Sequence, residues 1–308
     1  MKPRPSTCPW LRWTYFFPPP MTVKTLPLLT IFLLPAALAL AAPAEKTPAP
    51  AGAAEALFQQ ARTALHAEGG PADPGQVFAL MKKAAEQGHA EAEAGLGYLY
   101  SVGIGTEKDD AQAVVWFRKG AEKGSRKGQF NLGRMIANGR GPAKDLKEGF
   151  RWMQQAAEQG LPEAVLAVGD AFYSGKFGQS ADPKKAHPWL LKAAEGGMAS
   201  AQNFVGLMHQ DGKGAPLDRK QAEAWFRKAA AQGQVNGQSN LGHLLYNQPG
   251  DRPAKIEALM WLVVAKQRGE VLATRTLALI ESTVPKDDMT EARRLARERA
   301  TASKPPSP

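Results

Sequence analysis

The chain has 308 residues, of which 44% are apolar and 22% charged, and its formal net charge at pH 7 is +10. This composition is that of a globular protein and excludes collagen-like, wholly disordered and polytopic membrane proteins. Basic and acidic residues alternate along the chain instead of clustering, so the positive balance gives little support for a nucleic-acid partner. The only cysteine is Cys8, so the rest of the chain can form neither a disulfide nor a thiolate metal site.

Residues 21–44 have the parts of a secretory signal peptide. Lys24 supplies a positive charge, Leu26–Ala42 forms an apolar run, and small residues follow it. Pro27 and Pro35 interrupt the run, which disfavours a stable membrane span. We therefore predict a cleaved signal peptide, with an uncleaved anchor or a buried core helix as the alternatives.

The segments on either side of this signal are predicted to contribute nothing to the fold. Residues 1–20 fit no part of a signal peptide, and we interpret them as an upstream mis-start, with Met21 as the true start. Residues 45–52 are rich in proline and alanine and are predicted to form a disordered spacer. The mature protein is then expected in the periplasm or outside the cell, without a membrane span.

A period of 36 residues runs through the rest of the chain. Segments similar to KAAEQG end at Gly88, Gly124, Gly160, Gly197, Gly233 and Gly269. Tryptophan keeps the same rhythm at Trp116, Trp152, Trp189, Trp225 and Trp261. The single step of 37 residues coincides with a longer turn at residues 175–178. A period of this length predicts a solenoid of stacked helical units.

Each unit is predicted to contain two helices. The first carries residues such as Ala92, Leu96 and Tyr100, whose spacing places them on one helical face. The glycine after the large residue is costly inside a helix, so it predicts close approach of a neighbouring helix. Turn glycines are expected to end the first helix. The second helix is expected to begin after an N-cap aspartate, at Asp109, Asp145, Asp182 and Asp218.

The predicted fold class is all-α, an α/α solenoid over residues 53–300. Five clear units occupy residues 90–269. Degenerate helix pairs at 53–88 and 270–300 are predicted to cap the ends, and residues 301–308 to form a loose tail. The mature protein is expected to be a soluble, almost wholly helical monomer.

The repeat signature resembles a known family. Its halves read A-x-x-x-L-G-x-x-Y-x-x-G-x-G and D-x-x-x-A-x-x-W-F-R-K-A-A-x-x-G, and residues 201–233 carry the pattern almost whole. It is similar to the Sel-one-like repeat family, a relative of tetratricopeptide repeats. The resemblance implies a scaffold that binds other proteins, often in bacterial envelope, signalling or host-interaction settings. Gly149, in place of an alanine, and Gln248-Pro249-Gly250, in place of Gly-x-Gly, are departures expected to weaken single units.

No residue pattern predicts a catalytic centre, a metal site or a cofactor. The histidines lie neither three nor four residues apart, as a helical zinc pair would require; they are His66, His89, His187, His209 and His243. The sequence lacks the G-x-S-x-G and S-x-x-K motifs of acyl-transfer serine enzymes. The tryptophans could form a ligand-stacking ladder, but their spacing among alanines favours core packing, with Trp152 and Trp189 buried between neighbouring helices.

The first helices are predicted to present the partner-binding surface, because solenoids bind along their inner face and related repeat proteins line it with these helices. The candidate residues follow the recurring Leu-Gly or Val-Gly pair: Tyr98, Arg134, Asp170, Leu207 and His243. The next positions are part of the same candidate surface: Leu99, Met135, Ala171, Met208 and Leu244. Met, Tyr and Arg are enriched in interface cores. The alternative for each residue is inter-unit packing or plain solvent exposure.

Three functional classes remain open. The favoured class is an exported bacterial scaffold that binds a protein of the cell envelope. The second is a secreted virulence or signalling factor that binds a host protein, and the third is a hydrolase acting on cell-wall peptides or β-lactams. The repeat signature does not identify the partner, because solenoid surfaces change specificity without changing the repeat.

Overall fold

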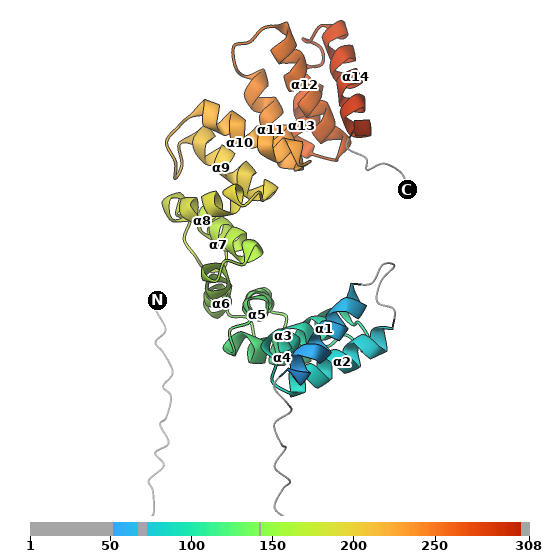
Figure 1. The fold of residues 1–308 in the computed structure, drawn as a ribbon. Coiled ribbons are helices and arrows are strands. Elements are labelled where there is room, and N and C mark those ends of the chain that lie inside the picture. The colour runs from blue at the N-terminus through green and yellow to red at the C-terminus, as the bar shows by residue number, and fades with distance from the viewer. Residues whose placement is uncertain (1–51, 67–72, 142, 303–308) are drawn as a thin grey trace, which may run out of the picture. The chain divides into compact units, whose positions relative to one another are not determined.

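A computed structural model describes residues 52–66, 73–141 and 143–302 (Figure 1). The predicted upstream segment and signal peptide, and the predicted spacer before Gly52, lie outside the described residues. Within the described ranges the chain forms α-helices and no strand, which confirms the all-α class. The helices are α1 (Ala53–Leu65), α2 (Pro74–Glu86), α3 (Ala90–Val102), α4 (Asp110–Glu122), α5 (Arg126–Asn138), α6 (Leu146–Glu158), α7 (Pro162–Ser174), α8 (Pro183–Glu195), α9 (Ala199–Asp211), α10 (Arg219–Ala231), α11 (Val235–Tyr246), α12 (Arg252–Gln267), α13 (Val271–Ile280) and α14 (Lys286–Ala302).

Consecutive helices form pairs that stack in chain order. From α1 to α12, each odd-numbered helix (a first helix) packs against the even-numbered helix that follows it (a second helix), and each pair packs against the next. Corresponding helices of adjacent pairs also touch, as α3 does with α5 and α12 with α14. Figure 1 shows the pairs following one another from α1 to α14. In the described part of the chain, extensive contacts join only neighbouring pairs, as in a solenoid.

Aspartate begins the second helices, as predicted. Asp109 Oδ1 accepts hydrogen bonds from the backbone N–H groups of Ala111 and Gln112, both at 2.9 Å. The same cap occurs at Asp73, Asp145, Asp182, Asp218 and Asp251. Each carboxylate satisfies amides that would otherwise have no partner, and it lies at the positive end of the helix dipole.

Interior glycines let the second helix approach the first. A Cβ atom at Gly97 would lie 2.8 Å from Cδ1 of Phe117, and one at Gly206 would lie 2.5 Å from Cε1 of Phe226. The same relation joins Gly169 to Leu190 and Gly242 to Leu262. The predicted close approach is therefore confirmed. Its cause is a large apolar side chain that lies over bare backbone.

A glycine in the left-handed backbone conformation ends each of α3, α5, α7 and α9. These residues are Gly103, Gly139, Gly175 and Gly212. The 37-residue unit has its longer turn after α7, and there Phe177 adopts a φ of 53°. It is the only non-glycine residue with a positive φ in the described ranges. Its side chain packs against the core formed by α6 to α9, and this contact holds the longer turn in place.

Trp261 is 3% exposed and lies in the core, as predicted, but the other tryptophans of the second helices are less buried than the sequence predicted. Trp152 and Trp189 are half-buried, whereas the next residues, Met153 and Leu190, are 1% and 0% exposed. Trp116 and Trp225 show the same relation to Phe117 and Phe226. The predicted burial of Trp152 and Trp189 was therefore wrong. The apolar stripe of the second helix is centred one residue later, and the tryptophan lies at its edge.

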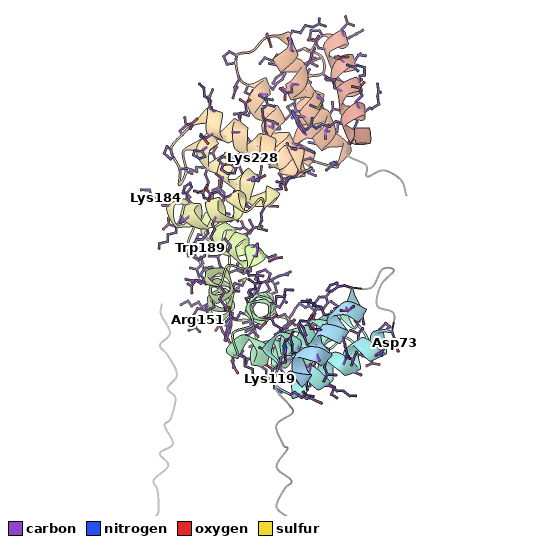
Figure 2. The ribbon with its side chains drawn as sticks, in the orientation of Figure 1. Asp73, Lys119, Arg151, Lys184, Trp189 and Lys228 are labelled. Atoms are coloured by element: carbon purple, nitrogen blue, oxygen red, sulfur yellow. The ribbon has the colours of Figure 1, made fainter. Side chains whose placement is uncertain are left out.

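The partly open tryptophan rings carry cations. Lys119 Nζ lies 3.9 Å from the centre of the Trp116 ring, and Lys228 Nζ lies 4.0 Å from that of Trp225. Figure 2 labels Lys119 and Lys228 with two further cations of the second helices, Arg151 and Lys184. A lysine stem that covers an aromatic face while its ammonium stays in water explains why the position needs no full burial.

The C-terminal helix is longer than predicted. Residues 301 and 302 belong to α14, so the prediction of a loose tail from residue 301 was wrong for these two positions. The rest of the predicted tail lies outside the described residues. None of the helices within the described ranges combines the length and apolar character that a membrane crossing requires.

Candidate functional site

The five candidate residues occupy one equivalent position on α3, α5, α7, α9 and α11, directly after the interior glycine. Tyr98, with 44% of its surface exposed, and Arg134 face solvent, whereas the other three are half-buried. The next residues in the chain are all at most 8% exposed: Leu99, Met135, Ala171, Met208 and Leu244. They belong to the core between the helices. Their predicted place on a binding surface was therefore wrong for Leu99, Ala171, Met208 and Leu244, whereas Met135 lines a surface hollow together with Tyr98 and Arg134.

Tyr98 and Arg134 come together across α3 and α5. Both line a hollow of about 180 Å³, which Asn131 and Arg140 also border. Arg140 donates from Nη2 to Asp110 Oδ1 at 2.7 Å. That hydrogen bond raises the pKa of the guanidinium and lowers the pKa of the carboxyl. One side of this hollow is thus held by a charged pair that joins successive units.

A larger hollow of about 470 Å³, here called the first groove, adjoins it on α1, α2, α3 and α5. Tyr98 and Asn131 line both hollows. Apolar side chains contribute much of the first groove, including Phe58, Leu65, Met81 and Ile104. Its charged residues are Arg62, Glu91 and Lys127. The arrangement offers apolar contact area beside charges of both signs, which suits a peptide or protein surface better than a single small ion.

Close packing fixes the walls of the first groove. A Cβ atom at Gly95 would lie 2.7 Å from Met81 Sδ, so the absence of a side chain on α3 makes room for the methionine of α2. Phe58 of α1 stacks on the His89 ring with centroids 4.7 Å apart. The His89 Nε2 atom lies 2.7 Å from Glu55 Oε2. These contacts hold α1 against the cap of α3.

The sequence reading did not identify the α1 side of the groove, because residues 53–88 were interpreted as a degenerate cap. The apolar residues Leu57, Phe58 and Leu65 were the available signal. Side chains from four helices form the groove, and no local motif records such a combination. Only the position of Tyr98 on the first-helix face was predicted.

Of the other three candidates, Asp170 and Leu207 make contacts within the protein, whereas the buried Nε2 atom of His243 has no hydrogen-bond partner among the described residues. Asp170 accepts hydrogen bonds from Ser174 Oγ and Lys176 Nζ, both at 2.8 Å. Leu207 packs against the core of the C-terminal pairs. Burial lowers the pKa of His243, and the nearby Glu270 charge partly opposes this effect. None of the three lines the two hollows described above. A binding role for them stays a prediction.

The described residues hold no cluster of three or more His, Cys, Asp or Glu side chains suited to a metal ion. Two histidines do meet, with the rings of His187 and His209 edge-to-face and 6.5 Å apart. Burial lowers the pKa of His187, and the His209 charge adds to that effect. A pair of rings in this arrangement lacks the further ligands that a protein metal site requires.

Comparison with known proteins matches this repeat architecture. The sequence profile of the Sel1 repeat matches residues 54–89, 90–125, 126–161, 162–198 and 199–234. The matched residues begin with the segment predicted to be a degenerate cap and end at residue 234, whereas clear units were predicted over 90–269. No curated protein sequence matches the chain.

Two solved structures extend the comparison. A Sel1 repeat protein from Oxalobacter formigenes has 30% sequence identity and a TM-score of 0.63, over 72% of this chain and 91% of that chain. The protective antigen c5321 of uropathogenic Escherichia coli, which displays an SLR fold, has 23% identity and a TM-score of 0.56. That match covers 84% of this chain and 65% of the other, and it concerns the fold alone.

Proposed function

The chain belongs to the Sel1 repeat family, and from this we propose that it is an exported bacterial scaffold that binds another protein in the cell envelope. Sel1 repeat proteins generally mediate protein–protein interaction, and they are typically non-enzymatic. The observation that carries the binding role for this chain is the first groove, with Tyr98 between two adjoining hollows.

The residue types of this surface support a protein partner. Tyr98 has a large ring, and 44% of the residue's surface is exposed. Arg134 lies beside it, and its guanidinium carbon is 5.6 Å from the centre of the Phe130 ring. Tyrosine and arginine are the residue types that most often dominate binding energy at interfaces. Both protrude from helices whose opposite faces are buried, so the backbone is already ordered when a partner binds and only side-chain freedom is lost.

The proposed export rests on the sequence of residues 21–44, where a cation, an apolar run and small residues follow one another. The test is a fusion of residues 21–50 to a reporter enzyme that is active only outside the cytoplasm. We expect activity, and we expect its loss when the apolar run at residues 28–34 is deleted. Export that survives the deletion would contradict a signal peptide and the envelope location with it.

The binding surface is tested by photo-crosslinking in the native envelope. A photoreactive amino acid replaces Tyr98 on the first-helix face, and in a matched variant it replaces Val115 of α4, a second-helix residue with 46% exposure. We expect the same crosslinked protein to be recovered repeatedly from position 98 and not from position 115. Arg134→Ala is expected to reduce that recovery about tenfold, as loss of an interface anchor does. Equal crosslinking from both positions would mean that the first-helix face is not the specific binding surface.

A crosslinked species found only in culture supernatant, attached to a protein of another organism, would indicate the host-binding alternative. Recovery from the envelope fraction would support the scaffold role proposed here. The two outcomes are separated by the location and identity of the partner.

A further inference from the structure

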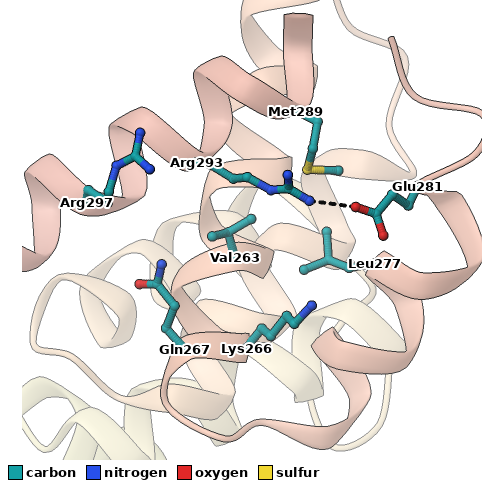
Figure 3. Close-up of a pocket in the computed structure, with 8 residues that line it drawn as sticks. All are labelled: Val263, Lys266, Gln267, Leu277, Glu281, Met289, Arg293 and Arg297. Atoms are coloured by element: carbon teal, nitrogen blue, oxygen red, sulfur yellow. Dashed lines mark hydrogen bonds and ion pairs between the residues drawn. The ribbon is translucent and has the colours of Figure 1, made fainter. Parts of the chain in front are cut away.

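A pocket between α12, α13 and α14 lies outside the surface assigned above to the partner. Its volume is about 430 Å³, and its lining comes from all three helices and from Glu281, the residue after α13 (Figure 3). We call it the C-terminal pocket. Sites that take ligands commonly have volumes of about 300–1,000 Å³, so it has room for a few side chains of a ligand.

The floor of the C-terminal pocket is apolar. Val263, Leu277 and Met289 form it, and they are 7%, 4% and 6% exposed. All three belong to the core that joins α12, α13 and α14. Figure 3 shows Val263 and Leu277 between Arg293 on one side and Lys266 and Gln267 on the other. Because core packing holds these side chains, the floor exists before any ligand binds.

The rim of the C-terminal pocket is cationic. Lys266, Arg293 and Arg297 border it and are exposed, and Glu281 is the only carboxylate in its lining. Arg293 Nη2 lies 2.6 Å from Glu281 Oε1, the contact dashed in Figure 3. Lys266 and Arg297 have no ion-pair partner among the described residues. Two exposed cations without a carboxylate partner among the described residues therefore lie beside an apolar floor.

Arg294 provides a contrast on the same helix. It is the next residue along α14 after Arg293, and it pairs with Glu291 at 2.6 Å and also with Glu298. On α14, Arg294 is thus paired with carboxylates and Arg299 lies over the Trp261 ring. Arg297, which lines the pocket, has neither kind of partner among the described residues. A ligand of the C-terminal pocket is therefore expected to be negatively charged.

We propose that the C-terminal pocket binds an acidic segment of a partner protein. In this proposal an aspartate or glutamate carboxylate pairs with Arg297 or Lys266, and a neighbouring aliphatic side chain covers Val263, Leu277 and Met289. Arginine suits this role because its planar guanidinium can donate two parallel hydrogen bonds to a carboxylate. The apolar floor distinguishes such a segment from a simple anion, because an ion alone would leave that floor uncovered.

Nucleic acid and membrane surfaces fit this pocket less well. Phosphate backbones are bound by stripes or clusters of cations that follow several successive charges. Here three cations and one carboxylate surround a single hollow, which provides for one or two negative charges. The C-terminal pocket also shares no residue with the first groove, so this inference and the proposed function succeed or fail separately.

The test measures binding of short fluorescent peptides to the whole chain by anisotropy. The probe alternates glutamate with leucine; one control peptide has glutamine for each glutamate, and a second has serine for each leucine. We expect the probe to bind, and each control peptide to bind about tenfold more weakly, because one removes the charge and the other the apolar contact. Binding should also weaken between about 50 and 300 mM salt.

The chain offers a matched set of variants. Arg297→Gln and Lys266→Gln are each expected to weaken probe binding about fivefold to tenfold. Arg294→Gln makes the same change in net charge on the same helix and is expected to alter binding less than about twofold. Circular dichroism melting of each variant shows whether it is folded. Peptide affinities are then compared among folded variants only.

Three outcomes would overturn the proposal. Equal weakening by Arg294→Gln would mean that the probe senses only general surface charge. Equal binding of the serine peptide, or full displacement of the probe by an equal concentration of inorganic phosphate, would mean that the pocket is a simple anion site. Stronger binding of a single-stranded oligonucleotide or of anionic phosphatidylglycerol vesicles, lost in Arg297→Gln, would assign the pocket to a different occupant.

Discussion

Gly133 of α5 and Gly149 of α6 face each other across their helix pair without room for a side chain on either. A Cβ atom at Gly133 would lie 2.5 Å from the carbonyl oxygen of Gly149, and one at Gly149 would lie 2.6 Å from that of Gly133. Other units have an alanine at the second position, at Ala113, Ala186 and Ala222. The departure at Gly149 was expected to weaken its unit. Instead it permits a backbone-to-backbone contact.

Gly149→Ala is therefore expected to destabilise the protein by about 1–3 kcal/mol, the range for overfilling a packed site. The gain in helix propensity, about 1 kcal/mol, offsets part of this. Urea denaturation measures the difference. Gln155→Ala, at an exposed position of the same helix, is the control and should change stability by less than about 0.5 kcal/mol. A more stable Gly149→Ala variant would show that the helices can separate without cost.

The adjacent residues Trp225 and Phe226 provide a second prediction. Phe226 is 0% exposed, whereas Trp225 is half-buried with Lys228 over its ring. Phe226→Ala is expected to cost about 3–5 kcal/mol, as for other buried aromatic residues. Trp225→Ala is expected to cost about 1–2 kcal/mol, because a smaller fraction of the Trp225 side chain is buried in the folded protein. Thermal or urea denaturation of both variants checks the order, and a larger loss for Trp225→Ala would reverse the assignment of the buried stripe.

A third prediction concerns the ion pair that joins α10 to α12. Arg227 pairs with Glu257 on the next second helix, and Trp261 Nε1 donates to the same carboxylate at 3.2 Å. The hydrogen bond from Arg227 holds the pKa of Glu257 below its ordinary value. A double-mutant cycle with Arg227→Gln and Glu257→Gln is expected to give a coupling of about 0.5–1.5 kcal/mol.

The matched control for that cycle is the exposed pair of Arg294 and Glu291, which lie on one helix. Its coupling is expected to be smaller than that of the Arg227 pair, because water and salt screen an exposed pair on one helix. Couplings of equal size in the two cycles would show that the Arg227 pair contributes nothing to the interface between units.

A fourth prediction concerns acid. Burial lowers the pKa of His243 in the folded protein, against about 6.5 in an unfolded chain. Below that value the unfolded chain takes up a proton that the folded chain binds less readily, so stability falls as the pH drops through it. Between about pH 7.5 and 5.5 most carboxylates stay ionised and contribute little to the change. His243→Gln should reduce the loss of melting temperature over this window.

His187, whose pKa burial also lowers, should behave like His243 when it is replaced by glutamine. An unchanged pH profile in both His187→Gln and His243→Gln would mean that neither ring is desolvated enough to matter.

The sequence predicted the features that depend on local backbone chemistry. Asp109 and its equivalents cap helices because a short carboxylate reaches the free amides from that position. Gly97 predicted close packing because glycine inside a helix needs a reason. Trp152 could not be placed so well. A stripe of period 3.6 leaves its centre uncertain by one residue, and a tryptophan at the edge of the stripe looks the same in sequence as one at the centre.

Surfaces formed by several units were harder to predict. The choice of Tyr98 followed from its place after a glycine, but its neighbours in the first groove, such as Phe58 and Lys127, come from other helices. The C-terminal pocket has no signature at all, since Lys266, Leu277 and Arg297 are brought together only by the packing of three helices. Residue contacts between distant segments depend on crossing geometry, which the repeat period does not specify.

Extensive contacts in the described ranges join only neighbouring helix pairs. The middle units therefore act as a spacer between the two ends of the stack. The first groove lies on α1, α2, α3 and α5, and the C-terminal pocket lies on α12, α13 and α14. Removal of one whole unit, such as residues 162–198, would take one step out of the stack between these two surfaces and leave the residues of both untouched. The number of repeats would then set how far apart two bound segments can be held.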